Sequence, residues 1–135
     1  MAPTLLVFSE YGILVLRVVL AVILITHGIP KIRRFAEAVE QFRSLGVRPA
    51  RVLVGVAALV EIGGGLCLLL GFFTQFAALA IALQFLFIVL YVKRHARTLV
   101  GGYELDLLLF AGALALVTLG AGTWSIDSFL RIILY

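Results

Sequence analysis

The feature that most constrains this chain is a long apolar stretch with one charge inside it. Residues Val52 to Phe73 run for 22 positions as VLVGVAALVEIGGGLCLLLGFF, and Glu61 is the single charged residue among them. A helix needs roughly 20 apolar residues to cross the hydrocarbon core of a bilayer. A carboxylate at that depth costs on the order of 3 kcal/mol. The rest of the fold therefore has to supply a partner for Glu61.

The composition is that of a membrane protein. Of the 135 residues, 64% are hydrophobic and 13% are charged, and the mean hydropathy is +1.21. A soluble domain has about a quarter of its residues charged. The net charge of +4 does not indicate a nucleic-acid partner, because the basic residues lie between apolar stretches. The length predicts a single domain over residues 1–135, embedded in the lipid bilayer.

Four apolar stretches predict an all-α fold, an integral membrane four-helix bundle with two amphipathic surface helices. The spans are expected at about residues 11–29, 52–71, 74–92 and 102–121. The first span is expected to be retained, since it lacks the pattern of a cleaved signal peptide.

The amphipathic helices are expected at about residues 32–45 and 125–134, where apolar residues recur on one helical face. In the second of these, Asp127 and Arg131 are expected on the opposite, polar face. The alternative for residues 32–45 is a solvated loop helix.

The distribution of basic residues predicts the orientation. Arginine and lysine are concentrated in the connections between spans one and two and between spans three and four, namely at Lys31, Arg33, Arg34, Arg43, Arg48, Arg51, Lys93, Arg94 and Arg97. Cytoplasmic connections carry such an excess. We therefore expect a multi-pass protein of the cell (inner) membrane with both termini on the non-cytoplasmic side.

Arg17 in span one is a candidate partner for Glu61. Counted from the predicted cytoplasmic ends at about 1.5 Å per residue, the two side chains lie at similar depths. A guanidinium can hold a carboxylate through two hydrogen bonds. The sequence favours an Arg17–Glu61 salt bridge that fixes the packing. It leaves open that both residues line a cavity for a polar head group or a proton path.

A second polar cluster is expected near the cytoplasmic face, where His27 ends span one and Glu104 and Asp106 begin span four. A histidine beside a carboxylate can relay protons or orient a quinone carbonyl. The alternative is a set of polar residues that cap helix ends, and the helix dipole favours Glu104 in a first turn without any catalysis. With two histidines, His27 and His95, and the single Cys67, no metal site is expected and haem ligation is disfavoured.

Several motifs in order give the chain a family resemblance. They are Thr26–Lys31 (THGIPK), Val60–Gly65 (VEIGGG), Leu70–Thr74 (LGFFT), Gly101–Leu105 (GGYEL) and Gly120–Asp127 (GAGTWSID), together with Arg17. This set resembles the DoxX family of small four-helix membrane proteins. The resemblance implies that Arg17, His27, Glu61 and Glu104 are the family's polar positions. It also implies a place beside redox partners, since some members are membrane subunits associated with thiosulfate:quinone oxidoreductase. Related redox bundles carry paired cysteines, which this chain lacks.

Three functions follow as hypotheses. The first is a membrane subunit of a quinone-linked oxidoreductase that binds quinone or docks a soluble or membrane redox partner; whether the chain is itself an enzyme stays open. The second is a non-catalytic scaffold or lipid-binding protein, and the third is a small transporter, based on intramembrane charge alone. The small residues Ala111, Gly112 and Ala115 of span four could also pack between protomers of a homo-oligomer.

Overall fold

The computed structural model describes residues 4–92 and 99–130, and these residues form helices and turns with no strand. The predicted all-α membrane bundle is therefore confirmed. In chain order, the elements are a 3-10 helix Thr4–Phe8, α1 Ser9–Arg33, α2 Phe35–Ser44, α3 Ala50–Leu70, α4 Thr74–Phe87 with a π-helical continuation Ile88–Val92, α5 Glu104–Leu119 and α6 Ile126–Leu130. The segment Leu99–Tyr103 leads into α5 and is kinked, with non-helical backbone at Val100 and Gly101.

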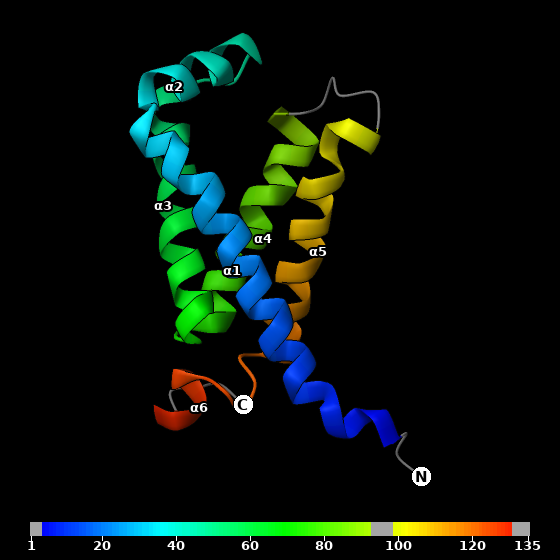
Figure 1. The fold of residues 1–135 in the computed structure, drawn as a ribbon. Helices are drawn as coiled ribbons and strands as arrows, with labels where there is room; N and C mark the ends of the chain where they lie inside the picture. The colour runs from blue at the N-terminus through cyan, green and yellow to red at the C-terminus, as the bar shows by residue number, and fades with distance from the viewer. Residues whose placement is uncertain (1–3, 93–98, 131–135) are drawn as a thin grey trace.

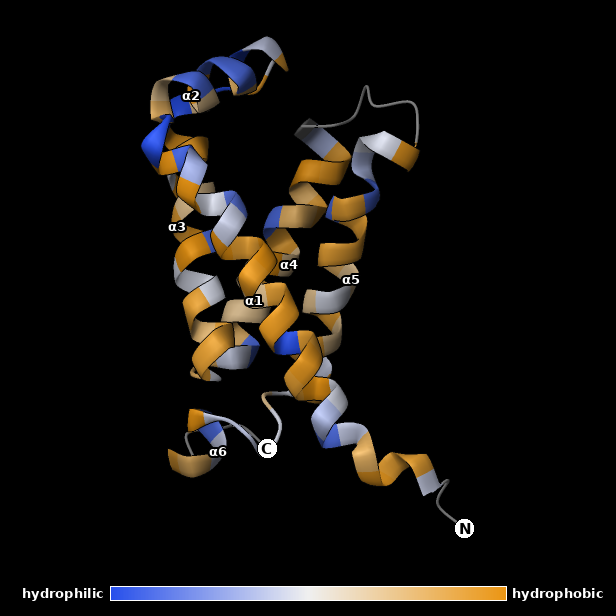
Figure 2. Ribbon diagram, in the orientation of Figure 1, coloured by the Kyte–Doolittle hydropathy of each residue, from blue (hydrophilic) through white to orange (hydrophobic). Residues whose placement is uncertain are grey.

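Four helical stretches are long and apolar enough to cross a membrane. They are Thr4–Arg33, Ala50–Leu70, Thr74–Tyr91 and Leu99–Leu119. Apolar residues run along the four long helices, whereas hydrophilic residues gather on α2 (Figure 2). The length and hydropathy of these helices place the chain in a bilayer.

The four long helices run alternately in opposite directions (Figure 1). The end of α1, all of α2, the start of α3, the end of α4 and the start of α5 lie at one end of the bundle, which we call the connection end. The start of α1 and the short α6 lie at the opposite end, which we call the terminal end. Helix α1 packs chiefly on α3, and α4 chiefly on α5.

Small residues set the register between α1 and α3. A Cβ on Gly28 would lie 3.1 Å from Glu61 Cβ, and a Cβ on Gly65 would lie 2.8 Å from Ile25 Cγ1. Glycine at such positions lets membrane helices approach closely. The middle of α3 therefore lies beside the last turns of α1, and the end of α3 lies beside the first half of α1.

Helix α1 is longer than predicted at its end. It passes through Pro30 and continues to Arg33, and the break comes at Arg34, whose φ and ψ are −121° and 51°. A proline removes one helical hydrogen bond, the one to the carbonyl of Thr26. The next turn still forms, since Arg34 N–H donates to the Pro30 carbonyl at 2.8 Å. The extra turn carries Lys31 onto the flank of the bundle.

Helix α2 turns its apolar face toward the protein. Val39 is buried and packs with Ala50 and Val54 of α3, with Phe35 and Phe42 beside them. The segment is thus an amphipathic helix, and residues of α3 cover part of its apolar side.

The C-terminal tail folds back and closes the terminal end. The Asp127 N–H donates to the Gly71 carbonyl at 2.8 Å. The Asp127 carboxylate accepts from the Phe73 N–H at 2.7 Å and from the Thr74 N–H at 2.9 Å. Asp127 therefore caps α4 from another part of the chain and places its negative charge at the positive end of that helix.

Asp127 corrects one expectation. It is 2% exposed and points into the bundle, not outward on a polar surface. The reason is that the first N–H groups of α4 need acceptors, and Asp127 supplies them. Phe129 of α6 is 86% exposed. Positions 131–134 of the second predicted amphipathic helix, including Arg131, lie outside the described residues.

Candidate functional site at the connection end

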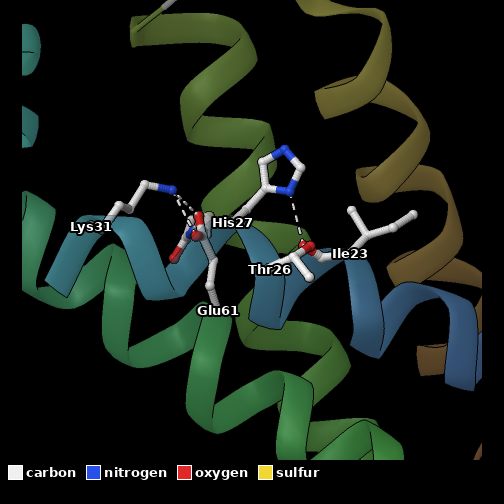
Figure 3. A network of polar contacts seen from close by, with 6 residues as sticks. Ile23, Thr26, His27, Lys31 and Glu61 are labelled. Atoms are coloured by element: carbon white, nitrogen blue, oxygen red, sulfur yellow. Dashed lines mark hydrogen bonds and ion pairs between the residues drawn. The ribbon is translucent and has the colours of Figure 1, made fainter. Parts of the chain in front are cut away.

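Glu61 is held by a lysine. Lys31 Nζ lies 2.6 Å from Oε1 and 2.6 Å from Oε2 of Glu61, and Gln84 Nε2 donates to Oε1 at 2.9 Å. The Glu61 side chain is 1% exposed, whereas the Lys31 side chain is 21% exposed. Figure 3 shows Lys31 reaching from α1 toward Glu61 of α3. A buried carboxylate therefore meets two donors from two other helices.

The register of α1 explains this pairing. Gly28 lies against Glu61, and Lys31 is three residues further on, on the same side of α1. The lysine stem can then run along the helix while its ammonium reaches the carboxylate. Gln84 comes from α4, which packs against α3.

His27 lies one turn before Lys31 and has one ring nitrogen engaged. Its Nδ1 is 2.9 Å from the carbonyl oxygen of Ile23. A carbonyl oxygen only accepts, so Nδ1 carries the hydrogen. Figure 3 shows the ring standing clear of the α1 ribbon, with Nδ1 turned toward Ile23. In the neutral ring, Nε2 is then an acceptor for another molecule.

These side chains border a cavity of about 710 Å³. Its polar lining includes His27, Lys31, Glu61 and Asp106, and Phe85, Ile88 and Leu109 supply apolar wall. Helix α2 contributes Glu37, Gln41 and Phe42, and Arg34 joins them from the break before α2. Residues of five helices thus border an open cavity that combines hydrogen-bonding groups with apolar surface, as small-molecule sites do.

The structure separates the two acidic residues predicted at the start of span four. Asp106 is 8% exposed and lines the cavity with His27. Glu104 is exposed, and its Oε1 accepts from the Gly101 N–H at 3.1 Å. Glu104 therefore fits the alternative role of a helix-end cap, and Asp106 is the acid that faces the site.

The predicted Arg17–Glu61 salt bridge is wrong. Gly28, not Arg17, lies level with Glu61, and Arg17 is 11 residues earlier in α1, about 16 Å along the helix axis. The depth estimate failed because the end of α1 and the start of α3 do not lie at the same level along the bundle axis. Helix α3 begins 11 residues before Glu61, whereas α1 continues for only five residues beyond Gly28.

Arg17 lies at the terminal end, against the C-terminal tail. Its Nη2 donates a hydrogen bond to the Trp124 carbonyl. The negative charge of Asp127 acts on the guanidinium at longer range. Gly71, with φ of +68°, makes room for the guanidinium, because a Cβ there would overlap Arg17 Nη1. Arg17 is 2% exposed. It therefore contacts the docked tail through one hydrogen bond and does not line the connection-end cavity.

The sequence did not identify three residues as partners of the buried charged groups in these two sites. Lys31 was counted as a topology signal, Gln84 as a polar residue of span three, and Asp127 as part of a surface helix. The available signals were the Gly120–Asp127 motif and the position of Lys31 one turn after His27. Neither signal identifies a partner until the register between helices is known.

The donor set suits an organic ligand. Across residues 4–92 and 99–130, no three histidine, cysteine, aspartate or glutamate side chains come together in a way that could hold a metal ion. The cavity does offer an ammonium, an imidazole and carboxylates beside apolar wall. Such groups bind carbonyl or hydroxyl oxygens.

The fold and the cavity define a class: a four-span helical membrane protein with a polar pocket at one end of the bundle. The profile of the DoxX family matches residues 12–94. The chain belongs to the DoxX family, and the resemblance seen in the sequence is confirmed.

Two relatives match over most of their lengths. The "Inner membrane protein YqjF" of Escherichia coli (strain K12) is 31% identical over 127 residues, which cover 91% of this chain and 95% of the relative. The "Putative oxidoreductase CatD" of Bacillus subtilis (strain 168) is 29% identical over 120 residues, 89% of this chain and 87% of the relative. No solved structure matches the chain significantly. Membrane residence is thus shared with a relative named as an inner membrane protein.

Proposed function

We propose that this protein is the membrane subunit of a quinone-linked redox system and binds the quinone head group in the connection-end cavity. The observation that carries the proposal is the cavity of about 710 Å³ with His27, Lys31 and Asp106 on its wall. The name of the Bacillus subtilis relative, "Putative oxidoreductase CatD", is in keeping with it.

The residues present fit a quinone head group. Its two carbonyl oxygens need donors in the oxidised form, and its two hydroxyls need acceptors in the reduced form. Lys31 has hydrogens to donate, and His27 Nε2 and the Asp106 carboxylate can accept. The volume lies within the range of about 300–1,000 Å³ that is usual for small-molecule pockets.

Each residue has a separate task in this proposal. A bound quinone supplies the capacity to carry two electrons and two protons. His27, fixed by its hydrogen bond to Ile23, presents Nε2 to a hydroxyl and takes a proton from it. Lys31 and Glu61 hold each other in place and set the charge at the floor of the cavity. Since the chain has a single cysteine, we expect the redox pair or cluster to belong to a partner protein.

Replacing His27 with alanine tests the proposal. We expect the dissociation constant for a head-group quinone to rise about tenfold, the effect of losing one hydrogen bond. The measurement is fluorescence or calorimetric titration of the purified protein in nanodiscs with a chain-free benzoquinone and its quinol. Thr118→Ala is the control, because Thr118 is exposed and its hydroxyl bonds only the Ala115 carbonyl of its own helix. Equal affinities for the unmodified protein and H27A would contradict the proposal.

A non-catalytic lipid-binding protein is the second candidate. The observation in its favour is the apolar part of the cavity wall, which includes Phe42 of α2 and Leu45 just after it. Mass spectrometry of extracted ligands separates the two candidates. Co-purified quinone supports the redox subunit, and phospholipid without quinone supports the lipid-binding protein.

The orientation is also a proposal. Among the described residues, Arg34, Arg43, Arg48 and Arg51 lie on or beside α2 at the connection end. The positive-inside rule then places that end in the cytoplasm. C-terminal fusions are expected to give an active alkaline phosphatase and a dark green fluorescent protein in a bacterial host. The reverse pattern would place the cavity on the outer side.

A further inference from the structure

We propose that the groove between α3 and α4 holds the apolar chain of the ligand whose head group lies in the connection-end cavity. The ligand would then enter sideways from the bilayer, between these two helices. The inference rests on the proposed function, and it adds the class of ligand: a quinone with a long hydrocarbon chain.

The groove is apolar and opens toward lipid. It has a volume of about 310 Å³, and its lining includes Val56, Ala57, Val60, Ala80, Leu83 and Phe87. Val56 is 50% exposed and Leu83 is 58% exposed. Exposed apolar side chains on a membrane-spanning helix face acyl chains, so the groove is reached from the hydrocarbon core.

The groove and the cavity meet. Phe42 and Ile88 line both of them. Gln84 lines the groove and also donates to Glu61, which lines the cavity. The two spaces therefore lie side by side with shared walls, and in this proposal one elongated molecule passes between them at these residues.

The combined space is polar at one end and apolar at the other, as an amphiphilic ligand is. Polar groups lie at its inner end, where Gln84, Glu61 and Lys31 meet, and the outer end is hydrocarbon. Gln84 Oε1 is buried and has no hydrogen-bond partner among the described residues. A hydroxyl of a bound head group would satisfy this oxygen, which directs the polar end of the ligand inward.

Filling the groove tests the inference. Ala80→Trp places an indole in the groove from an exposed position on α4. We expect this variant to bind a benzoquinone with a decyl chain at least tenfold more weakly, and to bind the same benzoquinone without the chain unchanged. The control is Val19→Trp, at a position of α1 that is 51% exposed and lines neither space. It should leave both affinities unchanged.

Photolabelling of the unmodified protein gives a second readout that does not depend on the variant folding. A quinone with a diazirine at the end of its decyl chain should label peptides of α3 and α4 that line the groove. An excess of unlabelled decyl quinone should suppress this labelling.

The outcomes separate the two proposals. If the chain-free quinone binds but Ala80→Trp leaves the decyl quinone unaffected, or the label falls on α1 or α5, the side entrance is overturned and the quinone site stands. If neither quinone binds the unmodified protein, the proposed function fails and this inference fails with it.

Discussion

Asp127→Ala is expected to lower the free energy of unfolding by about 4 kcal/mol. The substitution removes two hydrogen bonds to a charged acceptor, from the Phe73 and Thr74 N–H groups, each worth about 1.5–3 kcal/mol. It also removes the acid whose charge acts on the buried Arg17 guanidinium. Unfolding of the protein in detergent by SDS titration measures the loss.

Two further variants sharpen this test. Asp127→Asn keeps one acceptor oxygen but loses the charge, so we expect a loss of roughly 2 kcal/mol. Phe129→Ala is the control, because Phe129 belongs to the same short helix and is 86% exposed. Limited proteolysis should show α6 released in the alanine variant. If D127A and F129A have the same stability and the same protease resistance, Asp127 does not hold the tail.

Lys31→Met is expected to cost about 3 kcal/mol of stability. Removing one member of a buried ion pair leaves the other charge without compensation, which costs roughly 3–5 kcal/mol. Glu61 is the more deeply buried partner, at 1% exposed, so its charge is poorly solvated when the ammonium is lost. We take the lower end of the range because Gln84 still donates to Glu61.

Replacing the other member of the pair, Glu61, should cost less stability. Glu61→Gln leaves an amide that can bond to Gln84, and Lys31 can extend toward water, so we expect a loss of about 1 kcal/mol. The double variant K31M/E61Q should be close to E61Q alone. A result in which E61Q is the more damaging single change would contradict the assignment of Glu61 as the buried charge.

A double-mutant cycle also separates the two charged sites. Residues in contact show coupling energies of 0.5–3 kcal/mol, whereas distant residues add within about 0.5 kcal/mol. Arg17→Leu and Glu61→Gln should therefore be additive, while Lys31→Met and Glu61→Gln should be strongly coupled. Thermal unfolding in nanodiscs of the single and double variants measures both cycles.

The amino-acid sequence by itself determined the class of this protein. Bilayer residence, four crossings and the helical fold depend on length and hydropathy, which are local properties of each segment. The motifs around His27, Glu61 and Glu104 also identified the family. The amphipathic pattern of residues 32–45 predicted a helix that the structure places at Phe35–Ser44.

The tertiary structure alone decided which charges meet. Glu61 pairs with Lys31 because Gly28 and Gly65 let α1 and α3 slide into a register that puts Arg17 about 16 Å away. Arg17 reaches the Trp124 carbonyl, and Asp127 comes near enough to act on its charge, because the tail folds back onto the α3–α4 hairpin. No periodicity or spacing in the sequence predicts either arrangement. Register between helices is set by the fit of side chains across an interface, and that fit exists only when the helices are packed.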